Sequence, residues 1–283
     1  MLGPTMHINR EICHKHRYTS ALEKFKVTGV KYGYTGRRMR HHATCTCTGS
    51  CVPLEPCGEA HQRPSLPLQW RFPMSIVVTE PKSLALEILD LETDIFATTD
   101  KNATIEVPHA ELFTVRTDEG AIQLTQTEHY WQSPFATRPS LLHFLTRPRV
   151  KITVPTGTFL DALRVRTSSY CTIGGMHASY ADLTATEGTI RCRNSDFSHV
   201  QARASSASVL LVNCTVDEDA SLKVAGGAVL TVGTFDEMPG YRVREATGSV
   251  EIFGKQRSTG DSYDAENQPS VYITCSGGHV EVE

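Results

Sequence analysis

The sequence has no apolar run of the roughly 18 to 20 residues that a membrane-spanning helix requires. Its N-terminal segment also lacks the apolar core of a signal peptide. Cysteine is scarce: nine in 283 residues are too few for a disulfide scaffold, and an odd number leaves at least one unpaired. These absences predict a mostly reduced chain that is cytoplasmic by default, with no membrane span, and do not exclude association with a surface.

The chain as a whole has no strong charge of either sign, and its formal net charge is −3. This value argues against a global nucleic-acid or membrane binder. The charge is nevertheless divided, since residues 1–73 carry 11 Lys/Arg against 4 Asp/Glu, whereas residues 74–283 carry 17 against 27. We therefore expect a basic, Cys/His-rich extension over residues 1–73 that is flexible or disordered, followed by a single domain over residues 74–283.

A repeating pattern begins after Pro155. Six β-branched anchor residues follow one another at intervals of 17 to 21 residues, with a last interval of 30: Ile173, Ile190, Val209, Val229, Val250 and Val280. Glycine or alanine usually stands two residues before the anchor. Apolar residues stand seven before it, with the first copy shifted by one: Val165, Leu183, Ala202, Leu222, Val243 and Ile273. The recurrence indicates one structural unit that is used repeatedly.

Each unit has the pattern of two short alternating strands joined by a tight turn. Four residues after the anchors stand Asn194, Asn213, Gly233 and Gly254, which are residue types that tolerate a positive φ. A unit of about 20 residues cannot bury its apolar side alone, so units are expected to stack. The sequence thus predicts an all-β protein in which residues 161–283 form about six rungs of a β-solenoid. An antiparallel sandwich or barrel is the alternative.

The region before the repeat has strand-like alternation without a fixed period. Because the exposed end of a stack must be covered, we expect residues 74–160 to form irregular strands that cap the first rung. Residues 128–148 are rich in aromatics and proline, which favours a long loop over a core edge. The polar segment over residues 255–269 is interpreted as a loop inserted at one corner of the stack.

Several segments resemble a known bacterial family. They are residues 149–169, Thr186–Ile190, Ala246–Val250 and Cys275–Val280. Together they are similar to the putative-adhesin family, a bacterial β-strand-repeat domain of unknown function, over roughly residues 84–283. The resemblance implies a right-handed β-solenoid and a role in adhesion or surface interaction. It implies no catalytic residues.

The extension contains a cluster of thiol and imidazole candidates for metal ligands: Cys45, Cys47, Cys51, Cys57, His41 and His42. Thiolate and imidazole suit zinc, but structural zinc sites usually use cysteine pairs separated by two to four residues. Here the separations are one, three and five residues. We expect no bound metal and no cofactor. The basic run Lys31–His42 alternates arginine with aromatics but is too short to make nucleic acid an expected partner.

Acidic runs begin six to eight positions after successive anchors, at Asp196, Asp217–Asp219 and Asp236–Glu237. Stacking would align them along one edge, where they could bind calcium or act as the carboxylates of a glycosidase. A solvated acidic edge that discourages aggregation is the simpler interpretation.

The four cysteines of the repeat, Cys171, Cys192, Cys214 and Cys275, stand at different offsets from their anchors and are expected to be buried apolar fillers. No nucleophile or phosphate-binding motif accompanies them. The sequence therefore favours a non-catalytic β-repeat scaffold for binding or assembly, with an unidentified protein or glycan as partner. The alternatives are a carbohydrate-acting enzyme that uses the acidic corners, and metal or nucleic-acid binding through residues 1–73.

Overall fold

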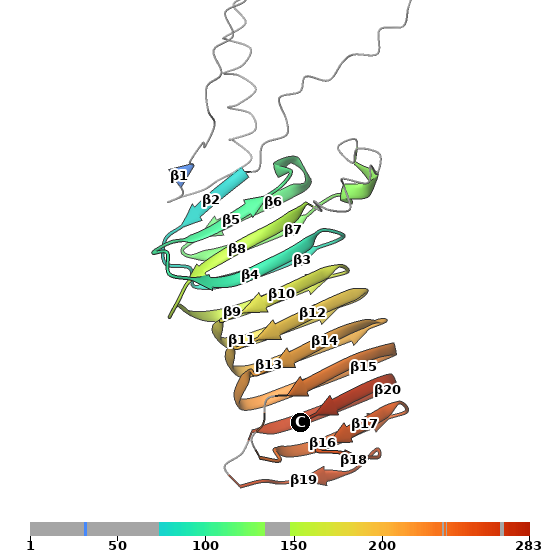
Figure 1. Cartoon of the computed structure of the whole chain (residues 1–283). Coiled ribbons are helices and arrows are strands. Elements are labelled where there is room, and N and C mark those ends of the chain that lie inside the picture. Colours follow the sequence, from blue (N-terminus) through green and yellow to red (C-terminus); the bar gives the residue numbers. More distant parts are fainter. Residues whose placement is uncertain (1–30, 33–73, 134–147, 234, 236, 267–268) are drawn as a thin grey trace, which may run out of the picture.

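The computed structural model describes residues 31–32, 74–133, 148–233, 235, 237–266 and 269–283 (Figure 1). These residues contain no α-helix, and the predicted all-β class is confirmed. None of them forms a helix with the length and apolar character needed to cross a bilayer. The elements in chain order are β1 (Lys31–Tyr32), β2 (Met74–Val78), β3 (Ser83–Ile88), β4 (Glu92–Thr98), β5 (Ala103–Val107), the 3-10 turn η2 (Ala110–Leu112), β6 (Phe113–Asp118), β7 (Ala121–Gln126), η3 (Tyr130–Gln132), β8 (Arg149–Pro155), β9 (Phe159–Thr167), β10 (Tyr170–Gly174), β11 (His177–Ala185), β12 (Gly188–Arg193), β13 (Asp196–Ser205), β14 (Ala207–Val212), β15 (Thr215–Gly233), β16 (Gly240–Ala246), β17 (Ser249–Ile252), β18 (Lys255–Gln256), β19 (Ser262–Tyr263) and β20 (Ser270–Val282).

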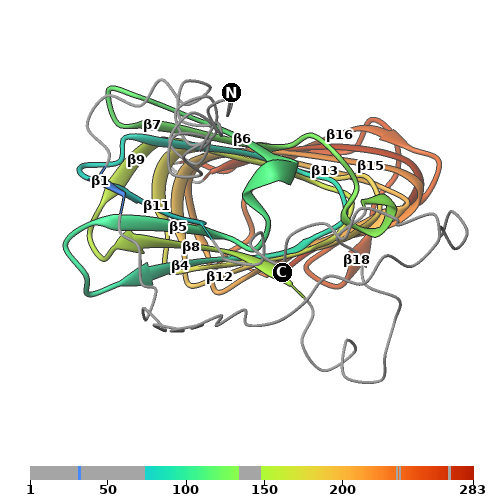
Figure 2. The same ribbon diagram turned by 90° about the horizontal axis from the view of Figure 1, so that it is seen from above.

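The strands belong to one large sheet that folds into two layers facing each other across an apolar interior (Figure 2). The first layer runs in the order β6, β7, β3, β9, β11, β13, the first half of β15, the first half of β20, β16 and β19. The second layer runs β1, β2, β5, β8, β4, β10, β12, β14, the second halves of β15 and β20, β17 and β18. Pairing is parallel within both layers and becomes antiparallel only at their ends.

Alternation of apolar and polar residues builds the interior between these layers. One row of the first layer lies in register across six strands, and every member is buried: Val165, Leu183, Ala202, Leu222, Ile273 and Val243. Paired strands lie about 4.8 Å apart, so these side chains pack directly on one another. These are the residues that the sequence pattern groups seven positions before the anchors.

The predicted anchor row of the second layer is wrong at Val229. Ile190 lies opposite Val209 as the pattern requires, but Val209 in turn lies opposite Leu230. Leu230 is fully buried, whereas Val229 faces outward and is 37% exposed. The corner before Leu230, at Gly226 and Gly227, is one residue longer than the corner before Val209, and this insertion moves the inward position by one.

The anchor row is also shifted in the first unit, where the corner is shorter and not longer. Ile190 lies opposite Cys171, and the predicted anchor Ile173 lies opposite Cys192. Cys171 and Ile173 are both fully buried, because they occupy alternate inward positions of the same strand. The corner between Val165 and Cys171 is one residue shorter than its counterpart in the next unit. The sequence pattern therefore places Ile173 in the anchor row, although Cys171 is the residue that lies opposite Ile190.

The corner that follows each strand of the second layer uses the residue types that were expected. Asn194 and Asn213 adopt positive φ values of 50° and 52°, and Gly175 occupies the same corner one unit earlier with 68°. Their backbone N–H groups donate to carbonyls of the next unit at 3.1 to 3.3 Å. Gly254 also has a positive φ, whereas Gly233 does not. Asparagine and glycine are favoured here because the left-handed region is costly for other side chains.

The stacking order differs from the chain order at the C-terminal end. β20 lies between β15 and the pair β16–β17, so the last segment of the chain lies inside the stack and not at its end (Figure 1). Val250 therefore lies opposite Val280 and does not contact the β15 row directly. The expectation that successive units lie directly on one another is wrong for this unit. The polar insertion was expected at a corner, but it contributes β18 and β19, which pair with β17 and β16 at the far end.

The N-terminal end of the stack also departs from the chain order. β3 and β4 lie between β7–β8 and β9–β10, and they pair in parallel on both sides. Part of the region expected to be an irregular cap is thus continuous with the parallel stack. β6, β5, β2 and β1 continue the two layers outward in antiparallel pairing. The expected loop over residues 128–148 contains η3, and its residues 134–147 lie outside the described residues.

Candidate binding face

The outward side chains of the first layer form two straight rows across its strands. Residues opposite one another in paired strands point to the same side of the sheet. From β6 to β16, one row contains Arg116, Gln123, Ala85, Arg164, Asp182, Gln201, Ser221, Tyr272 and Arg242. The adjacent row contains Thr114, Thr125, Glu87, Arg166, Thr184, Arg203, Lys223, Thr274 and Glu245, with Arg244 beside it at a shift of register. We call these two rows the arginine face.

The arginine face concentrates positive charge in an otherwise acidic domain. It carries seven Lys/Arg side chains and three carboxylates, while residues 74–283 as a whole hold 17 basic against 27 acidic residues. Arg164, Arg166 and Lys223 are exposed. None of these three makes an ion pair with another residue in the part of the chain that the structure describes. Their charges are therefore available to a ligand.

Other side chains of the face are held in place by their neighbours. The Asp182 carboxylate accepts hydrogen bonds from Arg203 at 2.9 Å and from the Thr184 hydroxyl at 3.2 Å. The Arg244 guanidinium lies over the Tyr272 ring, 5.4 Å from its centroid. These contacts reduce the number of conformations open to the long arginine side chains, which lowers the entropy lost on binding.

The larger depression of this face lies between β3 and β13 and has a volume of about 410 Å³. Its lining combines guanidinium, hydroxyl and carboxylate groups with two apolar residues: Glu87, Ile88, Leu89, Arg166, Thr167, Ser168, Thr184, Thr186 and Arg203. Arg166, Thr184 and Arg203 lie opposite one another on the adjacent strands β9, β11 and β13. A bound group at Thr184 would therefore have a guanidinium on each side.

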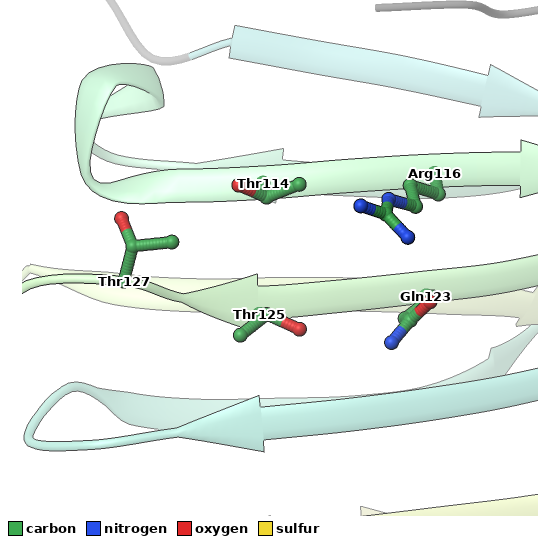
Figure 3. Close-up of a pocket in the computed structure, with 5 residues that line it drawn as sticks. All are labelled: Thr114, Arg116, Gln123, Thr125 and Thr127. Carbon is green, nitrogen blue, oxygen red and sulfur yellow. The ribbon is translucent and has the colours of Figure 1, made fainter.

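A second depression of about 210 Å³ lies between β6 and β7 (Figure 3). It is lined by Thr114, Arg116, Gln123, Thr125 and Thr127. Arg116 and Gln123 lie opposite each other at one end of the group, and the threonines lie along the rest of it. Thr125 pairs with Glu87 of the larger depression. The two depressions thus adjoin and form one polar surface.

A hydrogen-bonded corner fixes an exposed tryptophan near this surface. The Asp90 carboxylate accepts the backbone N–H of Tyr130 at 3.0 Å and of Trp131 at 3.3 Å, and also a bond from the Gln126 amide. The Gln126 carbonyl oxygen accepts the N–H of Leu89 at 3.0 Å. Trp131 remains 51% exposed beside the corner that contributes Leu89 to the larger depression.

The chemistry of the face suits recognition more than bond cleavage. Arginine forms paired hydrogen bonds with carboxylate, sulfate or phosphate groups, and threonine hydroxyls both donate and accept. Glycosidases rely on two carboxylates that flank the scissile bond. Within the described chain, the lining of the larger depression includes one carboxylate, Glu87, and that of the smaller one includes none.

The acidic corners proposed from the sequence are brought close to histidines. Asp196 lies 2.8 Å from His177, and it accepts the Thr215 hydroxyl at 2.8 Å. His199 lies 3.2 Å from Glu218 and 3.1 Å from Asp219. Asp236 lies outside the described residues. No group of three or more potential metal ligands is found among the residues that the structure describes.

The candidate metal ligands of the extension, Cys45, Cys47, Cys51, Cys57, His41 and His42, all lie outside the described residues. The cysteines of the repeat are described, and all four are buried: Cys171, Cys192, Cys214 and Cys275. Burial raises the pKa of Cys171 and of Cys275. A hydrogen bond between Cys192 and Cys214 raises the pKa of Cys192 and lowers that of Cys214. Burial of all four agrees with their expected role as apolar fillers.

Sequence reasoning missed the arginine face. Its local signal was present in Arg164-Val-Arg166 and Arg242-Val-Arg244, where arginines alternate with an inward valine. Such a pair places two cations on one side of a strand, about 7 Å apart. The sequence could not show that Arg203 and Lys223 extend the same rows, because that depends on the register of distant strands.

No family model matches the chain, and no curated protein does. The chain is similar to three solved bacterial structures at 10 to 13% sequence identity, each covering 75% of this chain. They are a "putative cell adhesion protein" from Clostridium sporogenes (13% identity, 99% of that chain, TM-score 0.39), a "putative adhesin" from Bacteroides fragilis (11%, 97%, 0.34) and a "putative lipid binding protein" from Parabacteroides distasonis (10%, 97%, 0.33).

Proposed function

We propose that the protein is a non-catalytic scaffold that binds a ligand through the arginine face. In this proposal residues 161–283 form about six rungs of a right-handed β-solenoid, and the rungs hold the binding side chains at fixed spacing. The role is adhesin-like: the fold supplies a rigid surface, and the outward rows supply its chemistry. Stacked strands suit such a role because each strand adds one more position to every outward row.

The observation that carries the proposal is the file of Arg166, Thr184 and Arg203 in the larger depression. These side chains come from three different strands, so their approach is a property of the fold and not of one local segment. The face is net positive although the domain is net negative, which separates it from the rest of the surface. Mutual repulsion among cations costs stability and is tolerated most readily where it serves binding.

The competing proposal is a carbohydrate-acting enzyme that uses the acidic corners. Two carboxylates would have to converge within about 5 to 10 Å on one groove. Asp196 instead pairs with His177, and Glu218 and Asp219 pair with His199. None of the described acidic corner residues is part of the lining of either depression. This arrangement supports binding over hydrolysis.

A charge reversal inside the larger depression tests the proposal. Thr184→Glu places a carboxylate between Arg166 and Arg203, where it pairs with both and neutralises the centre of the face. We expect binding to an array of immobilised polysaccharides and peptides to fall at least about tenfold, the effect of losing a charge-assisted contact. The bound polysaccharides should release no reducing ends.

The matched control is Thr172→Glu, because Thr172 is another half-buried, outward threonine, on β10 of the second layer. This variant should bind as the unaltered protein does. Equal binding by Thr184→Glu would show that the arginine face is not the site. Release of oligosaccharides from the array would favour the enzyme instead.

A further inference from the structure

We infer that the arginine face binds a linear anionic polysaccharide that lies across the strands, along the axis of the stack. The inference rests on the proposed function and adds the class of ligand and its direction. It is carried by three features of the face: the length of the two rows, the spacing of their cations, and the polar groups between those cations.

The rows are long enough for an extended polymer. They cross nine strands in the order β6, β7, β3, β9, β11, β13, β15, β20 and β16. At about 4.8 Å between neighbouring strands, they extend roughly 38 Å. Cations are found at both ends, Arg116 on β6 and Arg242 on β16, as well as in the middle. A small ligand would need only one depression, whereas a chain of sugars could contact the whole strip.

Between Arg166 and Arg203 the spacing of the cations fits charges that are separated by neutral units, whereas Lys223 lies next to Arg203 on the neighbouring strand, about 4.8 Å away. Arg166 and Arg203 are two strands apart along their row, about 10 Å, and they enclose Thr184. Arg164 lies on the same strand as Arg166, about 7 Å away along that strand. It therefore adds positive charge across the width of the arginine face and does not change the interval between Arg166 and Arg203. A polysaccharide with an acidic group on alternate sugars presents charges at a comparable interval along its length.

The groups between the cations are those that bind sugar hydroxyls. Threonine hydroxyls at Thr125 and Thr184 can donate or accept, and the Glu87 carboxylate accepts hydrogen bonds from hydroxyl groups. A polymer with a phosphate at every unit would place negative charge against Glu87 and Asp182. An acidic polysaccharide can instead direct neutral sugars toward these carboxylates and its acidic groups toward the arginines.

The two rows lack the series of free stacking platforms that single-stranded nucleic acids use, and the exposed Trp131 beside the larger depression supplies one ring only. Such proteins stack successive bases on exposed aromatic rings inside a basic groove. The aromatic residue within the two rows is Tyr272, and its ring is covered by Arg244. Tyr180 belongs to a neighbouring row, and its hydroxyl donates to Gln201 at 2.6 Å. The observations therefore favour a polysaccharide over a nucleic acid.

The experiment measures binding of the full-length protein to four probes: heparin, hyaluronate, which has a carboxylate on alternate sugars, neutral dextran, and single-stranded DNA of matched total charge. Arg164→Ala/Arg166→Ala removes two exposed cations of the arginine face. Lys151→Ala/Arg193→Ala removes two exposed, outward cations of the second layer and is the matched control. Thermal unfolding of both double variants should equal that of the unaltered protein, since none of the four side chains makes an ion pair or a side-chain hydrogen bond with another described residue.

We expect heparin or hyaluronate to bind more tightly than dextran and DNA. Arg164→Ala/Arg166→Ala should weaken this binding at least tenfold and flatten its dependence on salt, while the control pair changes it less than twofold. Dextran binding that equals the acidic probes and is lost in the same variant would overturn the anionic ligand but leave the proposed function standing. Tighter binding of DNA with the same loss would replace the polysaccharide by a nucleic acid. Unchanged binding in the arginine-face variant would overturn both the inference and the proposed function.

Discussion

Deletion of residues 270–283 is expected to unfold the C-terminal end of the stack while leaving its centre folded. β20 is the parallel neighbour of β16 and of β17, whose other described partners, β19 and β18, have two residues each. In a stack with nearest-neighbour contacts, removal of one strand leaves the strands beyond it without their main pairing partner. Backbone amides of β16 and β17 should exchange with solvent at least about 100-fold faster, while those of β9 to β12 keep their protection.

Glu281→Gln is the control for this deletion, because Glu281 faces outward on β20 and leaves the buried row of Val280 and Val282 intact. Protection of β16 and β17 should then be unchanged. If both strands stay protected after the deletion, they have moved to pair directly with β15, and the intercalated position of β20 is not essential for this end of the stack.

Phe197→Ala is expected to lower the free energy of unfolding by about 3 to 5 kcal/mol, the range for removal of a buried aromatic ring. Phe197 is among the largest fully buried side chains, at 1% exposure. It lies in file between Ala178 on β11 and Val216 on β15, and Ala178 is too small to fill the cavity that alanine would leave. Urea unfolding followed by circular dichroism measures the change.

Phe159→Ala is the matched comparison, because Phe159 stands near the start of β9 and is 60% exposed. Its free energy of unfolding should change by less than about 0.5 kcal/mol, as for an ordinary surface substitution. A larger loss for Phe159→Ala than for Phe197→Ala would contradict the inward and outward assignments of these strands.

Much of the strand content could be predicted because alternation is a local property. The row through Leu183, Ala202 and Leu222 follows from apolar residues at a repeated distance from the turns. The assignment of Val229 failed because the corner at Gly226 contains one more residue than its neighbour, and a shift of one residue turns a strand side chain to the other face. Corner length depends on backbone conformation, which the sequence constrains only weakly.

Neither the position of β20 nor the arginine face could be predicted from sequence. Both depend on pairing between strands that are far apart in the chain, such as Lys223 with Thr274. The interval of 30 residues before Val280 indicated an insertion but not that β20 would return to lie against β15. The same long-range pairing brings Arg203 and Lys223 into line with Arg166 on one face. The acidic edge could be predicted from the sequence because its residues recur at a nearly constant distance from the anchors.

Arginine footprinting tests the central claim most directly. A dicarbonyl reagent modifies exposed guanidinium groups, and mass spectrometry of the full-length protein locates each modified arginine with and without bound acidic polysaccharide. Binding through the arginine face predicts protection of Arg116, Arg164 and Arg166, with Arg193 on the second layer modified at an unchanged rate. Protection of Arg193 without protection of Arg164 and Arg166 would contradict the account.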